Sequence, residues 1–303
     1  MISFKVLKNE GDVNAFIKEN SSAIGTQKSE IAEMLKSNIE NADGAEIAAT
    51  LAAGCLTLRI YDGEYLFTCP VALSDNAEVF TAADEIRKYA IKEEIPLTFI
   101  DVYEDDVSEV CEPFRFVGVH PMDDSGEVFV VVPETEAGQL EELPTVKGEK
   151  ITLDAISEED ISDYAFLCRD NEVNRLYGND YKEDFGDASD EAFFQRMSFE
   201  VESGISMTFA VRYDGAFAGE ASIFAFDFIG GAKVAIRLLP EFWGKGIGSE
   251  ALDLILGVAR DIDLKRISTS VKKENVSSIA MTKKYMNYIG DENDTALFEA
   301  KFN

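Results

Sequence analysis

The pattern of hydrophobic and polar positions in the second half of the chain predicts alternating strands and helices. Apolar runs rich in β-branched residues predict strands at residues 150–155, 207–213, 218–228, 233–239, 266–271 and 295–302. Helical spacing of apolar residues predicts helices over 161–176, over 189–201, from 251 onward and from 275 onward. An acidic start capped by Ser157 precedes the first helix, and Asp214-Gly215 predicts a tight hairpin turn. The pattern therefore indicates an α/β fold with a mixed sheet.

The first half repeats part of this order. Its pattern predicts a hairpin of residues 55–61 and 65–71, a helix at 82–92 and a strand at 97–102. An acidic-Val-Ser segment follows at 105–108, as it does at 274–277. A tandem duplication would explain the repeat, and the alternative is coincidence between two generic α/β units. Residues 134–146 are acidic and contain a proline, which predicts a linker between domains at 1–133 and 147–303.

A glycine-rich turn stands between the predicted strand at 233–239 and the helix that follows it. Its three glycines occupy alternate positions: Gly244, Gly246 and Gly248. A strand, a glycine turn and a helix start together present backbone N–H groups to a phosphate. The turn lacks the Gly-Lys-Ser/Thr ending of a P-loop and the G-x-G-x-x-G of dinucleotide-binding folds. The alternative is a glycine turn that binds nothing.

The residues around this turn resemble one family. The pattern P-x-x-W-G-K-G-x-x-x-E-A is matched at Pro240, Trp243, Gly244, Lys245, Gly246, Glu250 and Ala251. It is similar to the branch of the GNAT acetyltransferases that includes the ribosomal-protein N-terminal acetyltransferases. The resemblance covers about residues 147–303 and implies an acyl-CoA N-acyltransferase fold with splayed central strands and acetyl-CoA as co-substrate. In the first half, residues 73–78 occupy the position that corresponds to the glycine loop. They contain two carboxylates and no glycine. We therefore expect the first half to be a degenerate GNAT-like copy that does not bind coenzyme A.

The same resemblance assigns the cofactor-binding residues. Backbone amides of the strand before the loop would bind pantetheine, and those of the loop would bind the pyrophosphate. A helix start further on would lie near the pantetheine and the departing thiol. The residues at these three places are Ile236, Arg237 and Leu238; Trp243, Gly244, Lys245, Gly246, Ile247, Gly248 and Ser249; and Asn275 and Ser278.

The sequence identifies the catalytic acid and base less clearly than the cofactor-binding residues. The strand at 233–239 carries no carboxylate, although many relatives have a base there, so Glu220 and Asp227 on the preceding strand are the candidate bases. Either could equally be a plain surface or hairpin residue. Thr282 occupies the position at which many members have a tyrosine that reprotonates the thiolate. Tyr285 is the catalytic candidate in its place, and Tyr288 lies one turn further.

Composition and charge narrow the range of possible binding partners. A net charge of −30 disfavours binding to nucleic acid or to an anionic membrane surface. Residues 237–284 hold nine lysines and arginines against six aspartates and glutamates, a net charge of +3 that leaves −33 for the rest. The acidic remainder favours a cationic amine acceptor, or it serves solubility only. Four scattered cysteines and a single histidine predict no metal site, and no signal peptide or membrane span is evident, so a cytoplasmic protein is expected.

These observations predict an acyltransferase of class EC 2.3.1.-. It would transfer an acetyl group from acetyl-CoA to a primary amine of a small molecule or a protein N-terminus. The alternative is a non-catalytic GNAT-like sensor or scaffold that binds acyl-CoA. Aminoacyl transfer is a third interpretation, which the acidic charge disfavours. The sequence also allows two copies of the chain to pair into a homodimer.

Overall fold

The computed structural model describes residues 4–24, 26, 28–41, 46–51, 54–61, 64–68, 87–102, 114–119, 128–133, 140, 142–177 and 188–302. The chain divides into two compact units. The first comprises Met1–Glu134 and the short segment Asp227–Ile229, and the second comprises Thr135–Phe226 and Gly230–Asn303. Residues 73–78, residues 105–108 and most of the expected linker lie outside the described residues. The expectations about those segments stay predictions.

The first unit contains a seven-stranded mixed sheet in the order β1-β2-β3-β4-β5-β7-β6. Its strands and helices are β1 (Phe4–Leu7), α1 (Glu10–Glu19), α2 (Ser21–Ile24), α3 (Lys28–Asn41), β2 (Glu46–Leu51), β3 (Gly54–Tyr61), β4 (Glu64–Thr68), β5 (Leu97–Val102), β6 (Phe114–Val119) and β7 (Val128–Pro133). Residues 87–92, before β5, are also helical. Neighbouring strands are antiparallel except β4 and β5, which are parallel. The expected hairpin, helix and strand at 55–102 are thus present wherever the structure describes them.

The second unit contains an eight-stranded mixed sheet in the order β14-β15-β13-β12-β11-β10-β9-β8. Its first elements are β8 (Val146–Lys147), β9 (Ile151–Ala155), the 3-10 turn η3 (Glu158–Asp160), α5 (Ile161–Arg169), α6 (Asn171–Tyr177), α8 (Asp190–Glu202), β10 (Ser206–Tyr213) and β11 (Ala216–Phe224). The rest are β12 (Gly231–Leu238), the 3-10 turn η4 (Pro240–Phe242), α9 (Ile247–Asp261), β13 (Arg266–Lys272), α10 (Val276–Thr282), β14 (Asn287–Glu292) and β15 (Thr295–Lys301).

The two sheets follow one connection scheme. In the first unit, β1 to β4 form an antiparallel series, β5 is parallel to β4, and β7 and β6 complete the sheet. In the second unit, β9 to β12 form the same series, β13 is parallel to β12, and β15 and β14 complete it. Helices follow the first strand of each series, and another helix connects the two parallel strands. Among the described elements, only β8 adds a strand that the first unit lacks.

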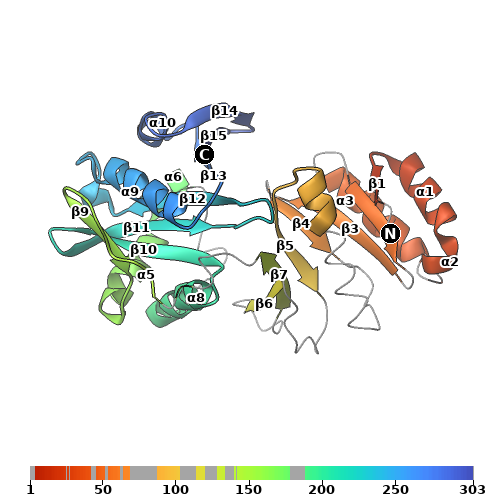
Figure 1. The fold of residues 1–303 in the computed structure, drawn as a ribbon, viewed down its shortest axis with the longest axis horizontal. Coiled ribbons are helices and arrows are strands. Elements are labelled where there is room, and N and C mark those ends of the chain that lie inside the picture. The colour runs from red at the N-terminus through yellow and green to blue at the C-terminus, as the bar shows by residue number, and fades with distance from the viewer. Residues whose placement is uncertain are drawn as a thin grey trace. The chain divides into compact units, whose positions relative to one another are not determined.

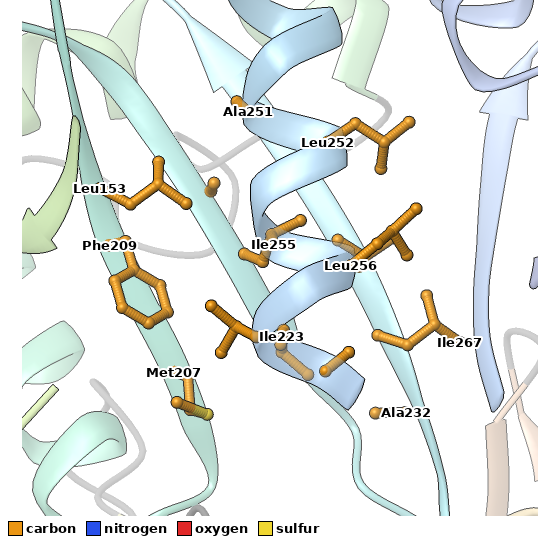
Figure 2. Close-up of a cluster of buried hydrophobic side chains, with 14 of the residues drawn as sticks. Leu153, Met207, Phe209, Ile223, Ala232, Ala251, Leu252, Ile255, Leu256 and Ile267 are labelled. Atoms are coloured by element: carbon orange, nitrogen blue, oxygen red, sulfur yellow. The ribbon is translucent and has the colours of Figure 1, made fainter. Parts of the chain in front are cut away.

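Helices cover both faces of the second sheet. Helix α9 lies along β9, β11 and β12, while α5 and α8 lie on the opposite face (Figure 1). Figure 2 shows the core between α9 and the sheet, in which the labelled side chains of the helix point at those of the strands. These side chains are almost completely removed from solvent: Leu153, Met207, Phe209, Ile223, Ala232, Ala251, Leu252, Ile255, Leu256 and Ile267. The burial fixes where α9 begins, and so it positions the glycine loop.

The two parallel strands of the second sheet stay paired over a short distance only. Strand β12 pairs with β13 from Gly231 to Lys233, opposite Arg266 to Ser268. Beyond these residues both strands continue, to Leu238 and Lys272, with no further pairing between them. The sheet therefore opens between the C-terminal ends of β12 and β13, as the splayed strands of the expected fold require.

Two predicted boundaries were wrong, and one strand was not predicted. The single helix expected over 161–176 is two helices, because Asp170 is extended at ψ 120° and its Oδ1 accepts the Val173 N–H at 2.9 Å, which begins α6. The strand expected to reach residue 228 ends at Phe224, where Ala225 takes a left-handed φ of 51°. Strand β14 was not expected at all. Its Tyr288 and Ile289 are more than half exposed, so the strand lacks the buried face that a hydrophobic pattern reports.

Candidate functional site

The glycine loop leads directly into α9. Gly244 and Gly246 have φ values of +70° and +82°, a left-handed region that side chains rarely adopt. Gly246 is the N-cap of α9, and no side chain caps the helix there. The loop from Trp243 to Gly246 is exposed. The 15-residue helix therefore begins after an exposed glycine loop and without a capping side chain, which is the local condition for binding a phosphate.

The exposed edge of β12 adjoins this loop. The N–H of Leu239 donates to Ala218 O on β11, so backbone groups at odd-numbered positions of β12 point toward β11. Those of Ile236 and Leu238 then point to the opposite edge, where the pairing with β13 has already ended. Trp243 Nε1 donates to Leu238 O at 2.7 Å. This bond fixes the loop on β12 and leaves the N–H of Leu238 and both backbone groups of Ile236 along the gap.

A carboxylate in the first turn of α9 is held away from the loop. Glu250 Oε1 accepts the N–H groups of Lys150 at 2.8 Å and Ile151 at 3.4 Å. A Cβ on Gly148 would lie 2.2 Å from the same oxygen, so glycine is needed for this approach. Lys150 Nζ would lie 3.9 Å from a Cβ on Gly246. The Lys150 ammonium therefore lies beside the helix start, where a positive charge favours a bound anion.

The expected residues after β13 lie at the start of α10, a helix that packs against α9. Asn275 is the N-cap of α10, and its Oδ1 accepts the Ser278 N–H at 3.1 Å. The hydroxyl of Tyr285 lies 3.2 Å from Ser249 Oγ in the first turn of α9. Tyr285 therefore contacts a residue assigned to cofactor binding. Its assignment as a catalytic residue stays a prediction.

The candidate base Glu220 is buried in an ion pair. Glu220 lies opposite Arg237 in the β11–β12 ladder, and Arg237 Nε donates to Glu220 Oε1 at 2.7 Å. The two side chains are 5% and 1% exposed. The guanidinium also contacts Cys168 Sγ at 3.6 Å and lies 5.0 Å from the centre of the Tyr177 ring. Arg237 was expected to bind the cofactor through its backbone, but its backbone groups point toward β11 and do not face the gap. Its side chain enters the layer between the sheet and α5 and α6.

The same layer changes the acidity of a thiol. Burial raises the pKa of Cys168, the nearby Arg237 lowers it, and Glu220 raises it further, with a net increase. Cys168 is a free, buried cysteine. Its raised pKa keeps the thiol protonated at neutral pH, so it is unsuited to act as a nucleophile.

The second candidate base lies elsewhere. Asp227 belongs to the turn between β11 and β12, and its Oδ1 accepts the Ile229 N–H at 3.0 Å. The segment Asp227–Ile229 groups with the first unit, whereas Glu220 belongs to the second. Glu220 lies within β11, whereas Asp227 lies beyond the end of that strand at Phe224, so the two candidate bases occupy different elements.

Sequence reasoning missed several residues of the site. Lys150 reaches the loop from the start of β9, and Cys168, Asn174 and Tyr177 reach the Arg237 layer from α5 and α6. Lys150 is 96 residues from Gly246, and Cys168 and Tyr177 are 69 and 60 residues from Arg237 in the sequence. One possible signal was Gly148, a glycine just before a strand, but the sequence does not show that it lies against Glu250.

Neither a metal cluster nor a membrane span is evident within the described residues. No group of three histidine, cysteine, aspartate or glutamate side chains there could hold a metal ion. No described helix is both long enough and apolar enough to cross a bilayer.

Comparison with known proteins gives one family match. Residues 150–285 match the family described as the acetyltransferase (GNAT) domain. This range runs from β9 through α10 and includes the whole glycine loop. No curated protein matches the sequence.

Solved structures with similarity to the chain include three acetyltransferases. RimL, a ribosomal L7/L12 alpha-N-protein acetyltransferase in complex with coenzyme A, is 18% identical over 52% of this chain and 98% of its own, with a TM-score of 0.46. Mycobacterium smegmatis RimJ in complex with CoA-disulfide is 19% identical over 50% of this chain and 81% of its own, with a TM-score of 0.43. A Vibrio cholerae spermidine N-acetyltransferase in complex with CoA and spermine is 16% identical over 50% of this chain and 94% of its own, with a TM-score of 0.43.

Proposed function

Because residues 150–285 match the acetyltransferase (GNAT) domain family, we propose that the second unit transfers an acetyl group from acetyl-CoA to a primary amine. The observation that carries this proposal is the placement of an uncapped helix start beside an unpaired strand edge. The helix start suits the pyrophosphate, and the backbone groups of Ile236 and Leu238 suit the amides of pantetheine. Lys150 and Lys245 add positive charge near the loop.

The chain has few chemical tasks in such a reaction. The thioester is already activated, so the protein must position the two reactants and accept a proton from the ammonium. We assign the proton to Glu220 Oε2, because Arg237 occupies the other oxygen and Glu220 lies in the same unit as the loop. Asp227 is the second candidate base. Tyr285, through its hydroxyl near Ser249, is the candidate donor of a proton to the departing thiolate.

Turnover of acetyl-CoA tests the proposal. The full chain is incubated with acetyl-CoA and a panel of primary amines and N-terminal peptides, and release of free thiol is measured. We expect acetylation of at least one acceptor, and a rate that rises from neutral toward alkaline pH as the amine loses its proton. Glu220→Gln should lower kcat by about 10²-fold or more, the usual contribution of a positioned base. Unchanged turnover in both Glu220→Gln and Asp227→Asn would leave attack by the neutral amine, with positioning as the main contribution.

A second candidate function is an acyl-CoA-binding sensor without catalysis. It is favoured by the engagement of Glu220 with Arg237 and by Thr282, which is 2% exposed, at the expected tyrosine position. Tight binding of acetyl-CoA by calorimetry, together with no thiol release with any amine, would support the sensor. Thiol release with an amine would exclude it.

We further propose that the first unit arose as a copy of the second and no longer binds coenzyme A. The shared strand order and the parallel pairing of β4 with β5 support the duplication. The sequence at 73–78, with two carboxylates and no glycine, supports the loss of binding.

A further inference from the structure

Two buried oxygen atoms in the second unit have no hydrogen-bond donor within the described part of the chain. They are Glu220 Oε2 and Asn174 Oδ1. Glu220 is 4% exposed and Asn174 is 6% exposed. Leaving a buried acceptor unpaired costs roughly 1–3 kcal/mol, and more for a charged group, so native proteins rarely keep one without a reason.

Both atoms belong to the layer between the sheet and α6. Asn174 and Tyr177 are three residues apart on α6 and so share one face of that helix. Tyr177 lies over the guanidinium of Arg237, which binds Glu220. Asn174 Nδ2 donates to Cys168 O at 2.8 Å, and the thiol of Cys168 contacts the same guanidinium. One chain of contacts therefore connects the two unpaired oxygens.

Neither side chain can satisfy its oxygen by turning over. Glu220 is held by its other oxygen, and Asn174 is held by its amide nitrogen. Reversing the Asn174 amide would place its oxygen against the carbonyl of Cys168 and lose the existing bond. Both open oxygen atoms are acceptors, so each of them needs an N–H or O–H donor.

We propose that Glu220 and Asn174 form the binding site for the ammonium group of the acceptor, with Glu220 Oε2 and Asn174 Oδ1 each accepting one of its N–H bonds. This assignment rests on the proposed acetyltransferase function and adds Asn174 as a binding residue. A primary ammonium has three N–H donors, which is enough for the two open oxygens. A calcium ion would need six to eight oxygens, and the two open oxygens do not supply them.

The experiment compares two cations of equal charge. Methylammonium carries three N–H donors, and tetramethylammonium carries none. Each is titrated into the full chain without acetyl-CoA, at constant ionic strength, and the dissociation constant is followed by NMR or calorimetry. We expect methylammonium to bind more tightly, and Asn174→Leu to weaken it about tenfold, the loss of one charge-assisted hydrogen bond. Gln195→Leu, at an exposed amide on α8, is the control and should leave the dissociation constant unchanged.

Equal affinity for the two cations in the wild-type chain would overturn the proposal and leave a buried water as the donor. Methylammonium binding that survives in both Asn174→Leu and Glu220→Gln would also overturn it. The wild-type comparison remains decisive if a variant fails to fold. Because acetyl-CoA takes no part, an absent preference contradicts the ammonium site alone, while an absent acetyl transfer contradicts the proposed function.

Discussion

Asp160 shows how a single side chain secures the start of the helical layer. It accepts the N–H and the hydroxyl of Ser157 and receives two hydrogen bonds from Arg212, at 2.7 and 2.8 Å. Arg212 also binds Asp154 on β9 at 2.8 Å. The arginine on β10 thus ties the strand before the helices to their first turn. Burial alone would raise the pKa of Asp160, but the bonds from Arg212 and Ser157 outweigh burial, so the pKa is lowered.

This lowered pKa has a consequence for acid stability. A carboxyl whose pKa is lower in the folded state stabilises the fold above its ordinary value of 3.8, and the contribution is lost as pH falls through the folded pKa. We expect Asp160→Asn to lower the free energy of unfolding at neutral pH by roughly 1.5–3 kcal/mol, the value of hydrogen bonds to a charged group. The variant should also lose less stability than wild type between about pH 4 and pH 2. Urea unfolding at several pH values measures both. Parallel pH curves for the two proteins would contradict the assignment.

At the scale of elements, the loop between β12 and α9 depends on backbone conformation more than on side chains. We expect Gly246→Val to weaken acetyl-CoA binding at least tenfold, because a β-branched residue at a φ of +82° distorts the N–H groups at the helix start. Gly257→Ala in the same helix is the matched control. A Cβ there meets nothing within 4 Å, so the change should raise helix stability slightly and leave affinity unchanged. Calorimetry that gives equal affinities for Gly246→Val and wild type would refute the loop assignment.

Strands and helices with strong hydrophobic patterns were predictable from the sequence, and contacts between distant segments were not. The strand at 207–213 and the helix from Ala251 bury one face, and their periodicity was visible. The ion pair of Glu220 with Arg237 depends on a register of two strands joined by a turn, and no local pattern encodes that register. Asn174 looked like an ordinary helix residue, because its buried environment depends on how α6 packs on β12.

At the scale of the whole molecule, charge is divided unevenly. The net charge of −30 arises outside residues 237–284, which carry a net +3 and include the loop, α9 and α10. We expect the acidic remainder to attract cationic acceptors from a distance, so kcat/KM for a dicationic amine should fall as salt rises toward about 0.5 M, where screening is nearly complete. A zwitterionic acceptor of similar length is the control and should respond weakly. Equal salt dependence for the two acceptors would assign the acidic charge to solubility alone.

The short pairing of β12 with β13 divides the second sheet into two parts. Strands β8 to β12 form one plate and β13 to β15 another, and three residue positions on each strand hold the two together. Parallel pairing is slightly less stable per residue than antiparallel pairing, and every other junction in this sheet is antiparallel. Apart from the two-residue edge strand β8, no neighbouring strands of this sheet pair over so few positions. Separating the plates would therefore break few backbone hydrogen bonds, and the hydrophobic core, which takes Ile223 from one plate and Ile267 from the other, is what keeps them together.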